Sequence, residues 1–333
     1  KDELFVARDR FGVKPVWWCE AGGRFHFASE LRALFALGAP HAVDRHSLLQ
    51  FFTYHFVPAP HAIVSGVQKL RPGHCLRVTA TGVKERAWYD VARSAAATPA
   101  APDPVARVRE LMDDAVRARL VSDVPVGTFL SGGLDSSIVS AIARRHKQDL
   151  HTFSIGYADD PFFDESAHAE EVARHIGSHH HTFRLTREEL AENYVRLLDA
   201  TDEPFADSSA LPSYMLCERT RKHVTVALSG DGSDEVFGGY SKHQAELRLR
   251  APGAAERAVI ALAPLWRTMP RSRNNRLANT FRKLDRFAGI AHAPEEHRWL
   301  KLASFDQEGD AERLVPHAAP AQEIDRRARA MAE

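Results

Sequence analysis

Short apolar segments, each flanked by turn residues, occupy the first ninety residues of the chain. Three of them have the length and the flanking turns of β-strands: residues 4–7, 13–19 and 24–28. Residues 30–37 predict a short helix, with Ser29 in the N-cap position and Gly38 at its end. Further short apolar runs continue to residue 90, so we predict a mainly β structure for this part.

From residue 105 to residue 120 the apolar positions recur every three or four residues, as on one face of a helix. Strand-like apolar runs then alternate with helical stretches. The predicted strands are residues 124–130, 150–156, 181–185 and 224–228, and the predicted helices are residues 136–145, 165–176 and 212–221. This alternation predicts an α/β fold with a parallel sheet and helices on both faces. Residues 241–333 are predicted to be helical.

An Ala- and Pro-rich stretch at residues 92–104 separates the two patterns and has no periodic apolar face. Such a composition is typical of a linker. We therefore expect one domain at 1–90, a linker at 91–104 and a second domain at 105–333.

Composition narrows the class of protein. The 333 residues include 44 basic and 44 acidic side chains, so no overall field draws the chain to nucleic acid or to a membrane. The three cysteines, at positions 19, 75 and 217, form no Cys-x-x-Cys pair, which favours a reducing compartment. No apolar run reaches the about 18 residues of a transmembrane helix. We expect a cytoplasmic protein, with Cys217 buried in a helix.

A serine- and glycine-rich segment follows the strand predicted at 124–130. It reads Ser131-Gly132-Gly133-Leu134-Asp135-Ser136-Ser137 and opens the next helix. Main-chain N–H groups and the positive end of a helix bind phosphate, and the glycines let the main chain approach its oxygens. Asp135 beside a polyphosphate predicts a bridging Mg²⁺. The spacing differs from that of a P-loop, which disfavours a P-loop ATPase.

A second segment follows the strand predicted at 224–228 and reads SGDGSDEVFGGY from Ser229 to Tyr240. Three carboxylates, those of Asp231, Asp234 and Glu235, lie within five residues and beside two glycines. This composition suits metal coordination or general acid–base chemistry near a nucleotide.

Together, the two segments resemble the glutamine-dependent asparagine synthetase family. The first is similar to the family's pyrophosphate loop, and the second to its second synthetase signature, in which Glu is more usual at the place of Asp231. Residues 150–157 resemble the family's adenine-binding strand and residues 202–209 its substrate-side loop. Residues 7–15 and 27–30 resemble the closing third of its glutaminase domain.

The resemblance implies both a fold and a reaction. The fold would be a truncated Ntn-type α-β-β-α glutaminase domain followed by a parallel-sheet ATP-pyrophosphatase domain with a helical C-terminal part. The reaction would use ATP to activate the side-chain carboxylate of aspartate as β-aspartyl-AMP, with release of pyrophosphate. Ammonia from glutamine would then attack and give asparagine and AMP. The implied partners are aspartate and glutamine or ammonia, and a homodimer stays open.

The resemblance also implies a role for each site residue. Asp135 and Asp234 would hold Mg²⁺, and Asp231, one methylene shorter than Glu, would lie near the acyl adenylate and assist loss of a proton from ammonia. The nucleotide would be bound by Leu130, Ser131, Gly132, Gly133, Asp135, Ser136, Ser137, Ile155, Ser229 and Gly230.

Both ends lack elements of the family pattern. The glutaminase nucleophile is an N-terminal cysteine, whereas residue 1 is Lys and Cys19 lies in a strand context. The family's later Arg-x-Pro segment and a functional lysine have no counterpart here. We therefore expect a partial sequence, truncated at both ends.

Three alternatives stay open. A relative could aminate another carboxylate, in a polysaccharide or secondary-metabolite pathway. A tRNA-modifying enzyme of the PP-loop class could use residues 248–286, where ten Lys and Arg accompany only Glu256 and Asp285, to bind RNA. The simplest interpretation of this basic region is that its side chains lie on solvated helix faces. The alternatives are a docking surface or a path for anions. The third alternative is an inactive nucleotide-binding remnant.

Overall fold

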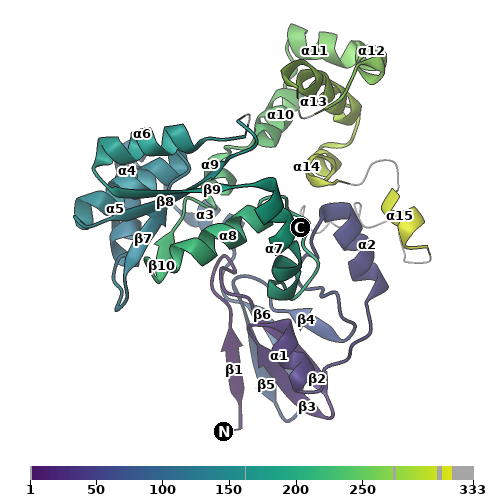
Figure 1. Cartoon of the computed structure of the whole chain (residues 1–333). Coiled ribbons are helices and arrows are strands. Elements are labelled where there is room, and N and C mark those ends of the chain that lie inside the picture. The colour runs from purple at the N-terminus through teal and green to yellow at the C-terminus, as the bar shows by residue number, and fades with distance from the viewer. Residues whose placement is uncertain (1, 162, 273–274, 306–309, 317–333) are drawn as a thin grey trace.

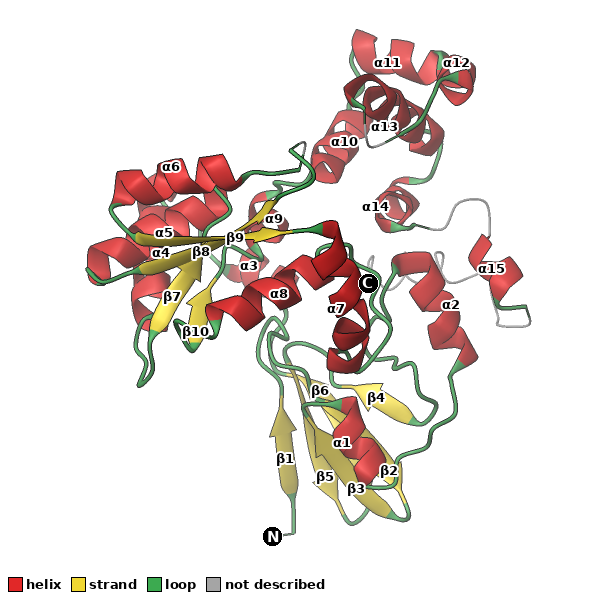
Figure 2. Ribbon diagram, in the orientation of Figure 1, coloured by secondary structure: helices red, strands yellow, loops and turns green. Residues whose placement is uncertain are grey.

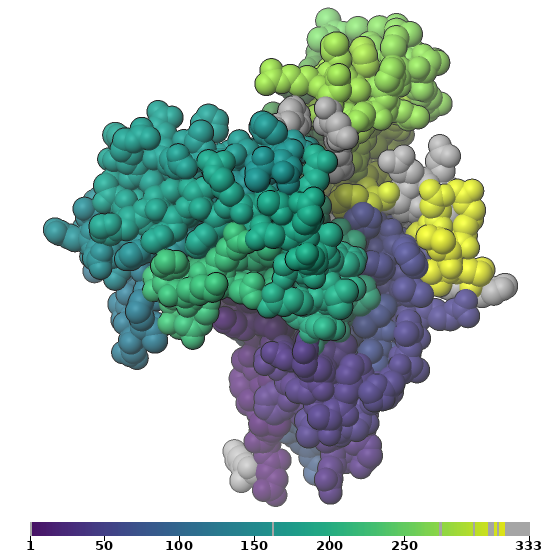
Figure 3. All heavy atoms as spheres, viewed as in Figure 1, coloured from purple at the N-terminus to yellow at the C-terminus, as the bar shows by residue number. Residues whose placement is uncertain are grey.

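A computed structural model describes residues 2–161, 163–272, 275–305 and 310–316 of the chain. Two parts built around β-sheets lie against each other, the N-terminal part at the bottom of Figure 1 and the part with the parallel sheet above it. The helices of residues 241–290 lie at the upper right, and the later helices lie below them. In the space-filling view of Figure 3, the last described residues lie against the N-terminal part.

The N-terminal part is a sandwich of two three-stranded antiparallel sheets, in the orders β1-β5-β6 and β3-β2-β4. The strands are β1 (Leu4–Ala7), β2 (Trp17–Ala21), β3 (Arg24–Ala28), β4 (Val67–Lys69), β5 (His74–Thr79) and β6 (Gly82–Ala87). Side chains alternate along β2, so Trp17 and Cys19 pack under helix α1 (Leu31–Ala36) while Trp18 packs toward the other sheet. Helix α2 (Arg45–Tyr54) follows.

The strand predicted at residues 13–19 begins later than expected, at Trp17. The carboxylate of Asp9 accepts hydrogen bonds from the N–H groups of Phe11, Val13 and Lys14 at 3.0–3.2 Å, which holds the preceding residues in a loop. Burial of this carboxylate opposes the effect of these bonds, but their sum lowers the pKa of Asp9.

The second part contains a four-stranded parallel sheet in the order β10-β7-β8-β9, as the alternating pattern predicts. The strands are β7 (Val126–Phe129), β8 (His151–Tyr157), β9 (His179–Leu185) and β10 (Val226–Leu228). Its helices are α4 (Pro104–Arg119), α5 (Leu134–His146), α6 (Ser166–Ile176), α7 (Arg187–Ala200) and α8 (Ala210–Thr220). Helices α5 and α6 cover one face and α8 the other (Figure 2).

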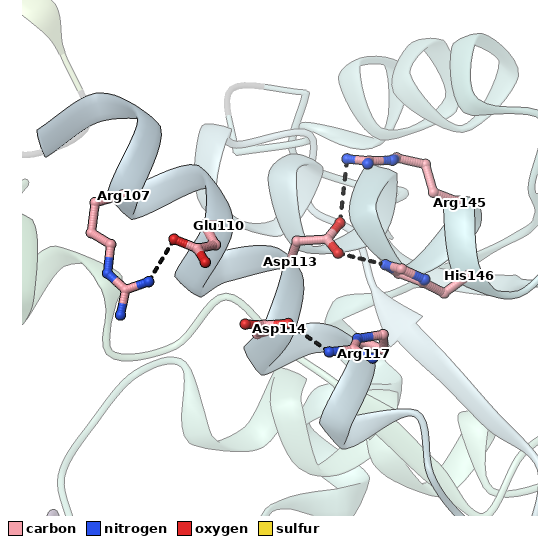
Figure 4. Close-up of polar contacts among 7 residues, drawn as sticks. All are labelled: Arg107, Glu110, Asp113, Asp114, Arg117, Arg145 and His146. Carbon is pink, nitrogen blue, oxygen red and sulfur yellow. Dashed lines mark hydrogen bonds and ion pairs between the residues drawn. The ribbon is translucent and has the colours of Figure 1, made fainter. Parts of the chain in front are cut away.

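Helix α4 is held on α5 by polar contacts at its outer surface. The Asp113 carboxylate lies 3.0 Å from Nε2 of His146 and 3.4 Å from the guanidinium of Arg145 (Figure 4). Apolar contacts of Met112 and Val116 with the α5 side complete this packing. Polar and apolar contacts therefore both fix α4 against α5.

The segment expected to be a linker contains helix α3 (Val91–Ala97). The side chain of Asp90 accepts a hydrogen bond from the N–H of Arg93 at 2.7 Å and so caps the helix. No residue of α3 is buried, which explains why no apolar periodicity predicts it. Asp103 caps α4 in the same way.

The C-terminal described residues are helical, as predicted. The helices are α9 (Ser233–Phe237), α10 (Ser241–Arg250), α11 (Ala254–Ala261), α12 (Ala263–Thr268), α13 (Arg276–Ile290), α14 (Glu295–Ala303) and α15 (Asp310–Leu314). Ala311 of α15 and Val315 pack on Leu49 of α2, which joins this end to the N-terminal part. Within the described ranges, no helix has the length and apolar character needed to cross a membrane.

Candidate functional site

The two predicted chemical segments lie next to each other because their strands are neighbours. Strand β10 pairs with β7 in parallel, with Val226 opposite Val126 and Leu228 opposite Thr128. Parallel strands end at the same edge of a sheet, so the loops that follow them meet there. Ser131–Ser137 leaves β7 and Ser229–Tyr240 leaves β10 at this edge.

The first loop is held in shape by its own hydroxyl groups. The hydroxyls of Ser131 and Ser136 lie 3.0 Å apart, and the Ser131 hydroxyl accepts the N–H of Gly133 at 3.2 Å. The Ser137 hydroxyl donates to the carbonyl of Gly133 at 2.6 Å. These bonds fix the turn from β7 into the N-terminus of α5, where main-chain N–H groups favour an anion.

Gly132 requires the absence of a side chain. Its φ is +83°, and a Cβ atom there would lie 2.7 Å from the main-chain nitrogen of Ala169 and from Cβ of His168. The loop therefore rests directly on the first turns of α6. The sequence predicts the need for glycine but gives no sign of the partner helix.

The second loop turns from β10 into α9 at Gly232, whose φ is +92°. The Ser229 hydroxyl donates to Oδ2 of Asp231 at 2.9 Å, and the Ser233 hydroxyl donates to the carbonyl of Gly230 at 2.9 Å. Asp231 is exposed, and Asp234 in the first turn of α9 is half-buried. Asp231 thus offers an exposed carboxylate, and Asp234 offers a half-buried one.

Gly230 brings the two loops into direct contact. A Cβ atom at this position would lie 2.8 Å from the main-chain nitrogen of Ser136 and 3.0 Å from Cβ of Asp135. Asp135, in the first turn of α5, is therefore adjacent to the loop that carries Asp231 and Asp234. The contact at Gly230 thus places the first turn of α5, with Asp135, beside the loop that carries the other two predicted acidic residues.

The other predicted nucleotide-site residues differ in how far their side chains are buried. The Leu130 side chain is fully buried against Ala169 and Ala173 of α6, and its N–H donates to the carbonyl of Phe153 at 2.8 Å. Any contact of Leu130 with a ligand would therefore come from its carbonyl. Ile155 is half-buried on β8, and Ser229 is exposed at the end of β10.

The acidic residues suit a hard cation that is shared with phosphate. Among the residues that the structure describes, no three or more His, Cys, Asp or Glu side chains are grouped to hold a metal by themselves. Mg²⁺ in nucleotide sites normally takes one or two protein carboxylates, and phosphate oxygens and water complete its octahedron. Asp135 and Asp234 fit this donor set, because each is half-buried and they lie on adjoining loops.

Tyr240 ties the end of the second segment back to its helix, a contact that the sequence analysis missed. The phenol donates to Oε1 of Glu235 at 2.7 Å. This hydrogen bond, with burial and nearby carboxylates adding to it, raises the pKa of Tyr240 to about 12. Tyr240 is therefore a neutral hydrogen-bond donor at ordinary pH. The SGDGSDEVFGGY pattern contains both residues but does not indicate that they pair.

The predicted substrate-side loop at residues 202–209 contacts the N-terminal part. Asp202 accepts the N–H of Leu31 at 2.7 Å through Oδ2 and the guanidinium of Arg32 at 2.8 Å through Oδ1. Asp202 thereby caps α1, whose predicted cap, Ser29, is wrong: the N-cap residue is Glu30 and makes no side-chain cap bond. The distance along the chain hides this partner from sequence analysis.

Glu203 makes a second contact between the two parts, and this one is largely buried. Its Oε1 accepts the N–H of Ile63 at 2.7 Å, and its Oε2 pairs with the ammonium of Lys69. Only 15% of the Lys69 side chain and 11% of the Glu203 side chain are exposed. Burial lowers the pKa of Lys69 and raises the pKa of Glu203, against the attraction between the two charges.

The sequence analysis makes a structural prediction for two of the three cysteines, Cys19 and Cys217. Cys19 is buried in β2, and burial raises the pKa of its thiol, which fits a structural side chain. The expectation for Cys217 is wrong in part, because this residue lies on α8 but is exposed. Helix α8 turns Met215 inward, and a residue two positions later points to the opposite side.

The histidine run at residues 179–181 is part of strand β9. Nδ1 of His151 lies 2.9 Å from Nε2 of His181, and the ring of His223 lies 4.3 Å from that of His181. His180 faces the other side, beside the hydroxyls of Thr152 and Ser154 at 2.8 and 3.0 Å. The ring of His181 stacks on those of His151 and Phe153, so the histidine rings do not converge on a point.

Two family models match successive stretches of the chain. A family model described as asparagine synthase matches residues 107–332, and one described as glutamine amidotransferase domain matches residues 1–89. Glutamine-hydrolyzing asparagine synthetase 1 of Bacillus subtilis (strain 168) is 32% identical over 297 residues, which cover 88% of this chain and 47% of that protein. Asparagine synthetase 3 of the same organism is 36% identical over 285 residues, which cover 79% and 46%.

The chain spans about half the length of the curated relatives it matches. Among solved structures, the glutamine-dependent NAD⁺ synthetase from Acinetobacter baumannii in complex with ADP is 13% identical, with a TM-score of 0.32. That match covers 83% of this chain and 70% of that chain.

Proposed function

This chain belongs to the asparagine synthase family, and on that premise we propose that it forms part of an ATP-dependent, amide-forming ligase of the cytoplasm. The proposed reaction converts aspartate to asparagine with ammonia released from glutamine. The observation that carries the proposal is the contact at Gly230, which joins the Ser131–Ser137 loop to the loop of Asp231 and Asp234.

The chemistry explains why both loops are needed. A carboxylate is a poor acyl donor, so an oxygen of the aspartate side chain first attacks the α-phosphorus of ATP and displaces pyrophosphate. The product is β-aspartyl-AMP. Ammonia then attacks the acyl carbon, AMP leaves and a proton is lost from nitrogen. One loop must bind the departing pyrophosphate, and the other must lie beside the acyl group.

The first loop would bind the pyrophosphate. Its N–H groups at the N-terminus of α5 would favour the negative oxygens, and the bonds of Ser131 and Ser136 would keep the turn from reorganising. Ser137, Leu130 and Ile155 complete the proposed nucleotide site. Gly132 and Gly133 would let the main chain approach closely.

Asp135 and Asp234 would hold Mg²⁺, which, when bound, neutralises charge on the phosphates. Asp231, exposed beside Ser229, would accept a proton from the attacking ammonia. The hydroxyl of Ser229 orients this carboxylate and leaves its other oxygen available. Ser229 and Gly230 would line the same site.

We propose the domain boundaries on the same basis: residues 1–90 belong to a glutaminase domain, 91–104 connect, and 105–333 belong to the synthetase domain. Asp202 and Glu203 would then connect the two domains, because they lie in the synthetase domain and accept hydrogen bonds from the glutaminase domain.

The test is release of pyrophosphate by the protein with Mg-ATP, ammonium chloride and a panel of carboxylic acids, with products identified by mass spectrometry. We expect asparagine, AMP and pyrophosphate with aspartate. Replacement of Asp135 by Asn should lower turnover at least about a hundredfold, as expected for loss of an electrostatic contact to the reacting group. The control is Asp123→Asn, an exposed aspartate before β7, which should keep full turnover.

Product formation from a different acid would keep the mechanism and change the acceptor. Undiminished pyrophosphate release by the folded Asp135→Asn protein would overturn the assignment of the site.

A further inference from the structure

A cavity of about 570 Å³ lies among the C-terminal helices, beyond the end of the second loop of the candidate site. Helices α10, α11 and α13 and residues 302–305 surround it, in the upper right part of Figure 1. Its volume is within the range of small-molecule sites, about 300–1,000 Å³. Tyr240, the last residue of the second loop, forms one end of its wall.

The polar lining of the cavity is mainly cationic. Lys242, Arg248 and Lys283 contribute to it, and Glu256 is the acidic side chain in the wall. Glu256 is already engaged, since its carboxylate accepts the N–H of Gly253 at 3.1 Å. Within the described residues, Arg248 and Lys283 form no ion pair with a carboxylate. The basic side chains of the described lining therefore outnumber its acidic side chain, Glu256.

Two further arginines shape the wall. Arg286 donates to the carbonyls of Leu302 and Ser304 at 2.7 and 3.0 Å, and Arg282 donates to Oδ1 of Asn279 at 2.8 Å. Lys242 lies over the rings of Tyr240 and Trp299 at 4.9 and 5.0 Å. These contacts hold Arg286, Arg282 and Lys242 in place, whereas Arg248 and Lys283 are exposed.

Apart from Tyr240, Ser241 and Gln244, the rest of the lining is apolar, with Val259, Phe287 and Leu302 among its residues. An inorganic anion would leave this apolar surface exposed to water. A ligand with an apolar body and a terminal carboxylate would cover the apolar wall and place its charge beside the cations.

We propose that this cavity is a binding site for a small organic carboxylate with an apolar body. The ligand's carboxylate pairs with Arg248 and Lys283, and its body packs on Val259 and Phe287. The site goes beyond the reaction proposed above and stands without it, because the four residues proposed to contact the ligand lie outside both loops. It gives the basic region at 248–286 a role other than that of solvated helix faces.

The experiment compares three probes by isothermal titration calorimetry with the chain in low salt. The first is 3-phenylpropionate, the second its uncharged analogue 3-phenylpropionamide, and the third acetate, which lacks the apolar body. We expect 3-phenylpropionate to bind at least about tenfold more tightly than either of the others, because the amide lacks the charge that strengthens hydrogen bonds to the cations and acetate lacks the apolar body. Added salt should weaken its binding.

Variants locate the site. Arg248→Ala combined with Lys283→Ala should weaken 3-phenylpropionate binding at least about tenfold. The matched control, Arg267→Ala, removes an exposed arginine of α12 that does not line the cavity, and binding should not change. Equal binding of acid and amide, equal binding of acetate, or an unchanged affinity in the folded double variant would each overturn the proposal.

A further binding measurement separates this site from the candidate active site. Asp135→Asn leaves the cavity intact, so this variant should bind 3-phenylpropionate as the parent does. Loss of binding in Asp135→Asn would contradict a separate site. Failure of pyrophosphate release in the parent protein would leave this result untouched.

Discussion

Glu203 and Lys69 form a buried ion pair that joins the loop at the end of α7 to strand β4 of the N-terminal part. The Lys69 ammonium also donates to the carbonyl of Val57 at 2.6 Å and lies 4.9 Å from the ring centre of Trp17. With Asp202 capping α1 nearby, two adjacent acidic residues anchor one part of the chain to the other.

Replacement of Glu203 by Gln should destabilise the protein by about 3–5 kcal/mol, because it leaves the Lys69 ammonium buried without its counter-charge. Urea unfolding followed by tryptophan fluorescence measures the change. The control is Glu3→Gln, which removes an exposed carboxylate from its pair with Arg77 and should have no measurable effect.

A double replacement, Lys69→Met with Glu203→Leu, removes both charges and should recover most of the stability lost in Glu203→Gln. If Glu203→Gln were as stable as Glu3→Gln, the pair would not hold the two parts together.

Replacement of Gly132 by Ala should cost more stability than the same change at Gly22. Both residues have positive φ, so each substitution imposes backbone strain of about 1–2 kcal/mol. A Cβ atom at Gly22 meets open space, whereas one at Gly132 overlaps His168 and Ala169. Urea midpoints of the two variants give the comparison, and Gly132→Ala alone should also lose pyrophosphate release.

Replacement of Gly230 by Ala should separate the two loops and abolish pyrophosphate release. The overlap with Ser136 and Asp135 is expected to cost about 1–3 kcal/mol. The control is Gly289→Ala on α13, where a Cβ atom meets nothing within 4 Å and the higher helix propensity of Ala should add about 0.5–1 kcal/mol. A fully active Gly230→Ala enzyme would show that the close approach is not needed.

Acid should destabilise the parallel sheet through its histidines. Burial, with the neighbouring histidines adding to it, lowers the pKa of His181 below 6.5, and burial lowers that of His180. The unfolded chain then binds these protons more readily than the folded one. Stability is therefore complete above pH 6.5 and decreases as the pH falls from 6.5 through the folded pKa values.

His181→Phe keeps a ring in the stack beside Phe153 and His151 and removes one proton site. We expect this variant to lose less stability than the parent between pH 7.5 and 5.5, as measured by urea midpoints. The matched control is His175→Phe, an exposed histidine of α6, which should follow the parent. A steeper acid loss in His181→Phe would contradict the lowered pKa of His181.

Local pattern is sufficient to predict the elements that carry the site. The strand at residues 4–7 agrees with β1, and the runs predicted from 124 onward correspond to β7, β8, β9 and β10, with ends that shift by a few residues. Strand alternation and glycine-rich turns are signals between neighbouring residues, so the sequence alone predicts the loops at Asp135 and Asp231.

Long-range contacts cannot be predicted in this way. Asp202 caps a helix that lies 171 residues earlier, and no pattern near Ser29 indicates that its predicted capping role passes to another residue. Helix α7 was missed although Thr186 and Glu189 form a reciprocal capping box, a signal that the sequence does contain.

The order of the sheet also affects how this chain emerges from a ribosome. Strand β10 is made last but lies beside β7, whose Val126 is paired with Val226. Until β10 has been synthesised, β7 is an edge strand with unpaired main-chain groups, the kind of edge that invites association with other chains. The loop of Asp231 and Asp234 arrives with the same strand, so translation closes the sheet and completes the candidate site in one step.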